Sequence, residues 1–294
     1  MRRTALAALG LAAALCAVAT TACTPGRRYV DMVFDSATKS TTTYKTTTDL
    51  TTAAPLTLVT DVYQPTGDAL GRRPAIVWIH GGGFKGGSRS DLATIANEWA
   101  RRGFVTLSIE YRLDKGNRCQ ELQDGLIPTD EVAAETARCT RDIVAAQNDA
   151  LSAVGWIRRH ADEYRVDPKR IAVGGGSAGA VTAVNVAQRA NPDHGPVPSG
   201  ATVGAALAMS GCQYDMASID ANDAPISILA SGGDPAVPYD CSVATLDEAR
   251  SLGTPTQRLL YPKESGHAQA LYKAHKATVD AAWSSFLIEH LDLA

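Results

Sequence analysis

Short runs of consecutive apolar residues recur along the chain from residue 74 onward, and stretches with a helical pattern separate them. Residues 75–79 (Ala-Ile-Val-Trp-Ile) are typical of a parallel strand buried on both faces. Residues 143–160 place apolar side chains three or four positions apart, which predicts a helix. We expect strands at 75–79, 104–109, 171–173, 203–209, 226–230 and 258–261, and helices at 91–102, 143–160, 178–189, 242–252 and 268–291. This alternation predicts an α/β fold with a mostly parallel central sheet and helices on both faces.

The segment before this region is rich in threonine and admits two interpretations. Low complexity over residues 27–64 is typical of a disordered or glycosylated stalk. Residues 44–48 and 56–63, however, are β-branched and aromatic, and the second run alternates apolar and polar positions. That alternation is typical of a half-buried antiparallel strand, so we favour strands over a stalk.

The first 22 residues differ from the rest and predict an exported protein. Arg2 and Arg3 precede an uncharged stretch rich in Ala and Leu, which is typical of a secretory signal peptide. An uncleaved membrane anchor is the alternative, although the stretch is barely long enough to span a bilayer. We expect a signal peptide at residues 1–22, a tether at 23–39 and one folded domain at 40–294.

The six cysteines bear on where this leader is cut. Cleavage after Ala19 would leave five cysteines, an odd number in an oxidising compartment, whereas cleavage before Cys23 would leave four that can all pair. Residues 20–23 (Thr-Thr-Ala-Cys) resemble a bacterial lipobox, with Thr20 in place of the usual Leu. We therefore favour lipidation of Cys23 and a cell-surface lipoprotein, with ordinary secretion as the alternative.

Composition and charge exclude several classes of protein. The chain has 294 residues, of which 45% are hydrophobic and 20% charged, and its formal net charge is −3. It has enough apolar residues for a substantial core, which excludes a disordered chain, a collagen-like repeat and a small disulfide scaffold. A near-neutral charge also predicts no nucleic-acid partner, and we expect membrane contact only through the signal or a lipid anchor.

Two glycine-rich motifs suggest chemistry. Residues 175–179 have the form G-x-S-x-G between a predicted strand and a predicted helix, where a sharp turn would raise the Ser177 hydroxyl above the sheet. Residues 80–84 (His-Gly-Gly-Gly-Phe) directly follow another strand, and their open backbone N–H groups could bind an oxyanion. The alternatives are an N-cap serine in a glycine-rich turn and a flexible or phosphate-binding loop, but no Gly-Lys-Ser/Thr follows.

With both motifs in order, the sequence resembles the α/β-hydrolase superfamily, and within it bacterial carboxylesterases of the hormone-sensitive-lipase-like and feruloyl-esterase-like branches. The resemblance covers residues 40–294 and is carried by residues 58–65, 79–84, 109–113, 167–171 and 174–179. It implies the α/β-hydrolase fold and an oxyanion hole made by the backbone N–H groups of Gly82, Gly83 and Ala178. The sequence departs from the hormone-sensitive-lipase pattern at two places. Asp114-Lys115 stands where that branch usually has Ala-Pro, and Gly176 stands where it usually has an acidic residue.

A serine hydroxyl needs a base, and the base needs an acid that fixes its tautomer. In this fold the order along the chain is serine, acid, histidine. His267 follows a predicted strand and a turn, as a base should, whereas His194 fits a surface loop and the later histidines fit the last helix. Asp234 follows the strand at 226–230 and is the predicted acid, with Asp240 as the nearest competitor.

The last four cysteines are expected to form two disulfides. They can pair in three ways, and we expect Cys119 to pair with Cys139 and Cys212 with Cys241. The first disulfide would close a polar, helix-poor segment near the rim of the site. We predict no metal and no organic cofactor.

The predicted function is a serine esterase that acts by acyl transfer on a small-molecule or polysaccharide-linked ester. The alternatives are a peptidase with the same machinery and an inactive binding protein of the same fold.

Overall fold

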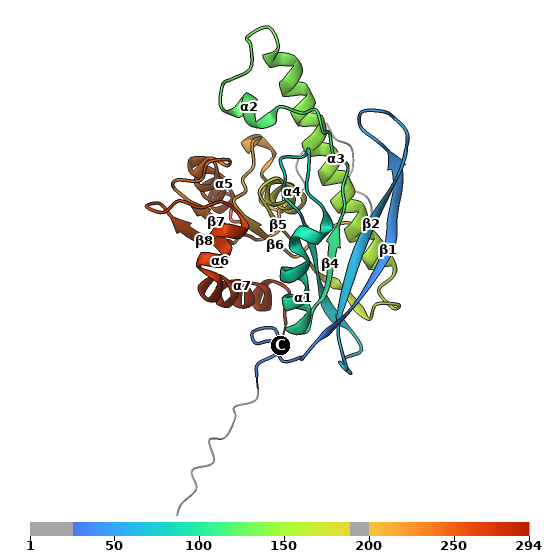
Figure 1. The fold of residues 1–294 in the computed structure, drawn as a ribbon. Helices are drawn as coiled ribbons and strands as arrows, with labels where there is room; N and C mark the ends of the chain where they lie inside the picture. The colour runs from blue at the N-terminus through green and yellow to red at the C-terminus, as the bar shows by residue number, and fades with distance from the viewer. Residues whose placement is uncertain (1–25, 189–199, 294) are drawn as a thin grey trace, which may run out of the picture.

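The computed structural model describes residues 26–188 and 200–293. Within them, eight strands form one mixed sheet in the order β1-β2-β4-β3-β5-β6-β7-β8 (Figure 1). The strands are β1 (Ala37–Thr48), β2 (Pro55–Pro65), β3 (Arg73–Ile79), β4 (Val105–Ile109), β5 (Val166–Gly176), β6 (Ala205–Met209), β7 (Ile226–Ser231) and β8 (Thr256–Tyr261). The pairs β1–β2 and β2–β4 are antiparallel and the others are parallel, so the predicted mostly parallel sheet is confirmed.

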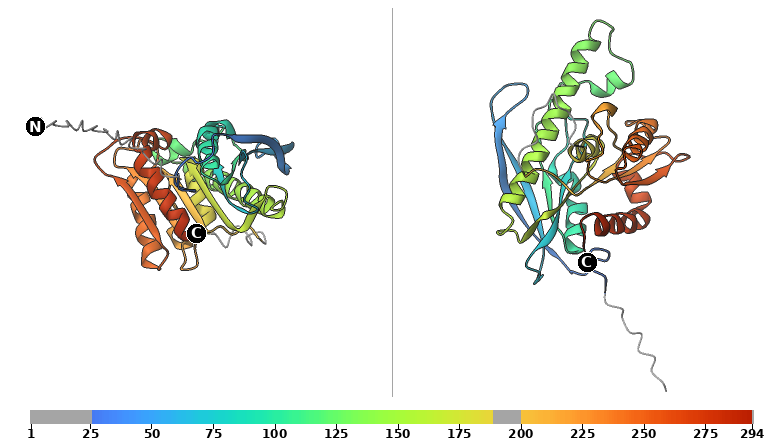
Figure 2. Two further views of the ribbon diagram at one scale, coloured as in Figure 1. Left: turned by 90° about the horizontal axis from the view of Figure 1, so that it is seen from below. Right: turned by 180° about the vertical axis from the view of Figure 1, so that it is seen from behind.

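Helices cover both faces of this sheet, as the alternating pattern predicted (Figure 2). The helices are α1 (Ala93–Arg101), α2 (Cys119–Gln123), α3 (Val132–Arg159), α4 (Ala178–Ala187), α5 (Tyr239–Ser251), α6 (Gln269–Ala274) and α7 (Lys276–His290). One core lies between the sheet and α3, α4 and α5, and a second lies between the sheet and α1, α6 and α7.

Strand β3 shows why a continuous apolar run is needed in the middle of the sheet. All seven of its residues are buried. Val77 and Ile79 belong to the core under α3 and α4, whereas Ile76 and Trp78 belong to the core under α1 and α7. Burial on both faces leaves no position for a polar side chain after Arg73, and the strand ends directly at the glycine motif of residues 80–84.

The segment between Cys119 and Cys139 is not helix-poor, and this expectation was wrong. It contains α2 and the first turns of α3, which begins at Val132 rather than at 143. The early turns of α3 extend past the sheet (Figure 1), so most of their side chains stay exposed and carry no apolar stripe. The predicted last helix is also divided, into α6 and α7, at His275.

The folded domain begins before residue 40, the boundary expected from the sequence. Strand β1 starts at Ala37 and pairs with β2 as a threonine-rich hairpin. Upstream, the buried Tyr29 donates its backbone N–H to the Arg102 carbonyl at 2.8 Å, and Arg28 forms an ion pair with Asp68 at 2.5 Å.

Several sequence predictions fall outside the part of the chain that the structure describes. These are the signal peptide at 1–22, Cys23 and His194. Among the helices that are described, none is both long and apolar enough to cross a membrane.

Candidate active site

The turn between β5 and α4 places Ser177 at the carboxyl edge of the sheet. Ser177 has φ 57° and ψ −125°, a strained conformation for a residue with a side chain. Its neighbours must be glycine, because a Cβ on Gly175 would lie 2.3 Å from the Gly179 carbonyl oxygen and a Cβ on Gly179 would lie 2.0 Å from the Ile79 carbonyl oxygen. The sequence thus builds the sharp turn that the G-x-S-x-G motif predicted.

His267 and Asp234 meet although 33 residues separate them. Nδ1 of His267 lies 2.9 Å and 3.0 Å from the two carboxylate oxygens of Asp234. The backbone N–H groups of Ala236 and Val237 each donate to Oδ1 of Asp234 at 2.9 Å. Burial raises the pKa of Asp234, but these hydrogen bonds and one from Ser210 outweigh burial and hold the pKa below its ordinary value. The carboxylate is therefore charged and can fix the tautomer of the imidazole.

The loop that carries His267 packs against the serine turn. A Cβ on Gly176 would lie 3.1 Å from Oε1 of Gln269 and 3.4 Å from Cβ of Ala268. No hydrogen bond joins the Ser177 hydroxyl to His267 within the described residues, so the two are brought together by packing of their loops. Such contacts commonly tighten only when substrate binds. The competing carboxylate, Asp240, lies in the first turn of α5.

The loop after β3 lies on the other side of Ser177. A Cβ on Gly81 would lie 2.8 Å from the Gly176 carbonyl oxygen and 3.1 Å from Cβ of Ser177. Gly82 and Gly83 adopt positive φ angles of 103° and 61°, and a Cβ on Gly82 would lie 2.3 Å from the Gly86 carbonyl oxygen. The loop therefore requires glycine and lies against the serine turn.

Three backbone N–H groups of the two glycine-rich motifs are candidate donors to an oxyanion. Among the described residues, the N–H groups of Gly82, Gly83 and Ala178 have no backbone acceptor. Ala178 is the first residue of α4, whose amino end favours negative charge. These are the N–H groups that the resemblance assigned to an oxyanion hole.

His80 supports this loop and is fully buried. Its Nδ1 lies 2.7 Å from the Gly81 carbonyl oxygen, and its ring stacks on Tyr111 with 4.3 Å between the centroids. Burial lowers the pKa of His80. This environment fits a structural role for His80 in the loop.

Two disulfides flank the site. Cys119 pairs with Cys139 and Cys212 with Cys241, with Cα–Cα distances of 5.6 Å and 5.7 Å. The first ties α2 to α3, and the second ties the loop after β6 to the start of α5. The pairing is the one chosen from the three that the sequence allowed.

Three polar residues near the site were not singled out from the sequence. Ser210 follows β6, and its Oγ accepts a hydrogen bond from the Ala268 backbone N–H at 2.9 Å. Gln123 and Tyr214 line a cavity beside Ser177. Ser210 could have been found by its place directly after a parallel strand, whereas Gln123 gave no such signal. In the described part of the chain, no three His, Cys, Asp or Glu residues lie close enough to hold a metal ion.

Comparison with known proteins agrees with this architecture. A family model described as alpha/beta hydrolase fold matches residues 139–229, and a second, BD-FAE, matches residues 60–124. The apo structure of Thermogutta terrifontis esterase 2 superposes with a TM-score of 0.65 at 20% identity, covering 85% of this chain and 94% of that one. The chain has the α/β-hydrolase fold.

Curated relatives extend the comparison. A fumonisin B1 esterase of Sphingopyxis macrogoltabida is 27% identical over 42% of this chain and 21% of its own length. The esterase LipI of Mycobacterium tuberculosis is 29% identical over 46% of this chain and 35% of its own length. A secreted lipase of Gibberella zeae is 30% identical over 36% of this chain and 18% of its own length. The match spans at most 35% of these relatives, and the similarity is to the carboxylesterase- and feruloyl-esterase-like branch that the sequence predicted.

Proposed function

We propose that the chain is a serine hydrolase of carboxylic esters that acts through an acyl-enzyme. One observation carries the proposal: the Asp234–His267 pair lies on loops of which one packs against the turn of the strained Ser177, beside N–H groups with no backbone acceptor among the described residues. The names of the relatives point the same way, since each is called an esterase or a lipase. One solved neighbour is esterase 2 of Thermogutta terrifontis phosphorylated by paraoxon (20% identity, TM-score 0.64).

Each residue has a distinct part in the proposed reaction. Ser177 attacks the ester carbonyl while His267 takes the serine proton and then gives it to the departing alcohol. Asp234 holds the imidazole and stabilises its positive charge. The N–H groups of Gly82, Gly83 and Ala178 stabilise the tetrahedral oxyanion, and water then repeats the sequence to release the acid.

The substrate class is part of the proposal. A small-molecule ester fits the names of the relatives, and a polysaccharide-linked ester is the narrower possibility that the feruloyl-esterase-like resemblance raises.

The test compares hydrolysis of p-nitrophenyl acetate with that of an aminoacyl p-nitroanilide, for the wild type and for Ser177→Ala. We expect the wild type to cleave the ester and not the anilide, and the variant to lose at least about 10³-fold in kcat. Preferred cleavage of the anilide would favour a peptidase. No cleavage of either substrate would favour an inactive binding protein.

Export is a second part of the proposal. The two disulfides support an oxidising compartment, and we propose that lipidated Cys23 anchors the protein at the cell surface. Fractionation of cells that produce the wild type or Cys23→Ser, with mass spectrometry of the mature N-terminus, tests this. We expect the variant to be released with unchanged specific activity, whereas a released wild type beginning at Thr20 would show ordinary secretion.

A further inference from the structure

A cavity of about 310 Å³ opens beside Ser177 and Ala178. Much of its wall is apolar and comes from four elements: Ile143 of α3, Val181 of α4, Leu122 of α2 and Val237 of the loop after β7. Among the residues that the structure describes, no Asp or Glu lines the cavity. A cavity with such walls next to a reacting serine suits the apolar part of a substrate.

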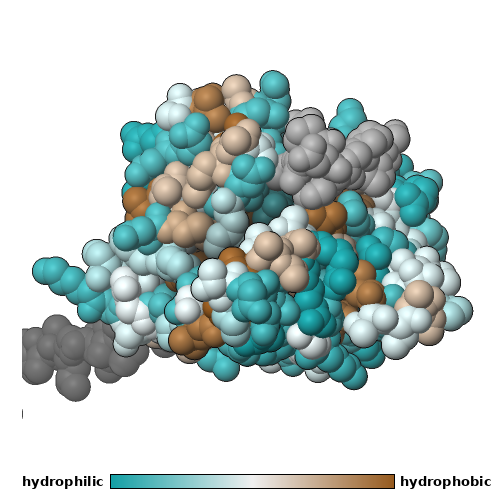
Figure 3. All heavy atoms as spheres, turned by 90° about the horizontal axis from the view of Figure 1, so that it is seen from above, coloured by the Kyte–Doolittle hydropathy of each residue, from teal (hydrophilic) through white to brown (hydrophobic). Residues whose placement is uncertain are grey.

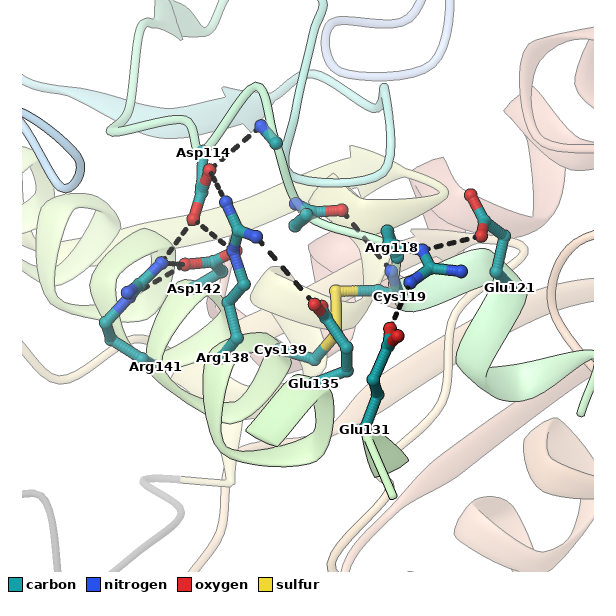
Figure 4. A network of polar contacts seen from close by, with 12 residues as sticks. Asp114, Arg118, Cys119, Glu121, Glu131, Glu135, Arg138, Cys139, Arg141 and Asp142 are labelled. Atoms are coloured by element: carbon teal, nitrogen blue, oxygen red, sulfur yellow. Dashed lines mark hydrogen bonds and ion pairs between the residues drawn. A yellow bond between two sulfur atoms is a disulfide. The ribbon is translucent and has the colours of Figure 1, made fainter. Parts of the chain in front are cut away.

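The outer wall of this cavity is the segment that contains α2. No side chain of α2 is buried, so the helix has no core of its own. The Cys119–Cys139 disulfide joins α2 to α3 (Figure 4). Arg118, at the start of α2, forms ion pairs with Glu121 at 2.7 Å and with Glu131 at 2.6 Å. The same close-up shows Asp114, to the left of the disulfide, in ion pairs with Arg138 and Arg141 of α3.

Gln123, the last residue of α2, is the link from this segment to the acid loop. Its Nε2 donates to the Ala236 carbonyl oxygen at 2.6 Å, and its Oε1 accepts from the Tyr214 hydroxyl at 3.1 Å. All three residues line the cavity. We call this set of contacts the Gln123 clasp. Because Ala236 also donates its N–H to Asp234, the clasp joins α2 to the loop that holds the acid.

The clasp is exposed and therefore weak. Each of its hydrogen bonds contributes about 0.5–1.5 kcal/mol at most, and Gln123 and Tyr214 are both exposed. Polar and apolar side chains are mixed over this end of the molecule (Figure 3). Without the clasp, the end of α2 would lose its links to the loops after β6 and β7, while the disulfide keeps the start of the helix in place.

We propose that this cavity is the acyl-binding pocket and that the Gln123 clasp sets the largest acyl group it accepts. The inference rests on the proposed esterase function. A volume of about 310 Å³ lies at the small end of the range of ligand pockets, which is about 300–1,000 Å³. The substrate class is thus an ester of a short apolar acid.

The experiment is a series of p-nitrophenyl esters from acetate to palmitate, with kcat/KM measured for the wild type, Gln123→Ala and Tyr214→Phe. We expect the wild-type value to be clearly higher for butyrate than for palmitate. Gln123→Ala should raise the palmitate-to-butyrate ratio at least about tenfold, the effect of one misfitted methylene in a tight pocket. Tyr214→Phe keeps the ring, removes one bond of the clasp and should shift the ratio in the same direction by less.

Asp124→Ala is the matched control, because Asp124 is the next residue, is exposed and does not line the cavity. Its profile should equal that of the wild type. A wild type that cleaves palmitate as well as butyrate overturns the pocket limit, and an unchanged ratio in Gln123→Ala overturns the clasp. If Gln123→Ala does not fold, Tyr214→Phe decides the same question. A wild type that cleaves no ester overturns the proposed function itself, so the failures are distinguishable.

Discussion

Removal of the Ser210 hydroxyl should disturb the pairing of His267 with Asp234 although neither of these two residues is substituted. Ser210 is 1% exposed and has φ 57°. Its Oγ accepts the Ala268 backbone N–H, and its hydroxyl also donates to the Asp234 carboxylate. Ala268 follows the proposed base and is itself strained, with φ 45° and ψ −117°. We therefore expect Ser210 to act as a positioning residue that fixes the acid and the loop of the base together.

The size of the effect follows from the bonds lost in Ser210→Ala. A hydrogen bond to a charged carboxylate contributes about 1.5–3 kcal/mol, and an unpaired buried N–H at Ala268 costs about 1–3 kcal/mol. Because the two losses overlap, we expect the free energy of unfolding to fall by about 2–4 kcal/mol. Alanine keeps the strained backbone of serine, so the difference reports the hydroxyl alone. A misplaced base should lower kcat about 10- to 100-fold and leave KM within about twofold.

The pH dependence of stability and activity below neutral pH gives a second test of the role of Ser210. The pKa of Asp234 is lowered in the folded protein, so its charge stabilises the fold above the ordinary carboxyl pKa, and this contribution is lost as the pH falls through the folded value. Loss of the Ser210 donor raises the folded pKa of Asp234. As the pH is lowered, Ser210→Ala should therefore begin to lose stability and activity at a higher pH than the wild type does.

The assay is p-nitrophenyl butyrate hydrolysis from pH 4 to 9 together with urea unfolding. Ser285→Ala is the control, because its exposed hydroxyl bonds only to a carbonyl of its own helix. If Ser210→Ala matched this control in kcat, in its acid limb and in its urea midpoint, the positioning role would be refuted.

Three further perturbations test other parts of the account. Asp234→Asn should lower kcat by about 10³–10⁴-fold with the fold intact, because an amide can favour the wrong tautomer of the base; a fall of less than about tenfold in the butyrate assay would count against the acid. Gly179→Ala should lower the free energy of unfolding by at least about 3 kcal/mol, since its Cβ would overlap a carbonyl oxygen of β3, whereas Gly71→Ala, with open space around it, should change it by less than about 0.5 kcal/mol in urea unfolding. Replacing both Cys212 and Cys241 by Ser should cost about 2–4 kcal/mol in the same measurement, and an unchanged midpoint would contradict a stabilising bridge.

The sequence predicted most where burial or backbone geometry limits the choice of residue. The strand at 75–79 was recognisable because β3 is buried on both faces. The turn around Ser177 was recognisable because only glycine fits at Gly175 and Gly179. These constraints act within one short segment, so the sequence of that segment alone is enough to recognise them.

Features that depend on contacts between distant segments could not be predicted in the same way. The start of α3 projects past the sheet, where a disulfide and ion pairs of Asp114 with Arg138 and Arg141 hold it instead of an apolar stripe. Tyr29 contacts Arg102 and Phe104, which lie between α1 and β4, although its own segment was expected to be a tether. The partners of Gln123 lie on loops after β6 and β7, about a hundred residues further along the chain, and no local pattern marks such a contact.

The central claim is that Ser177 is the nucleophile, and covalent labelling tests it most directly. The wild type and Ser177→Ala would be incubated with paraoxon, digested and analysed by tandem mass spectrometry, with residual butyrate hydrolysis measured in parallel. The account predicts one phosphoryl group per chain on the peptide that contains Ser177, loss of activity in proportion to labelling, and no label in the variant. A label on another residue that abolishes activity, or full activity in a wild type labelled at Ser177, would contradict it.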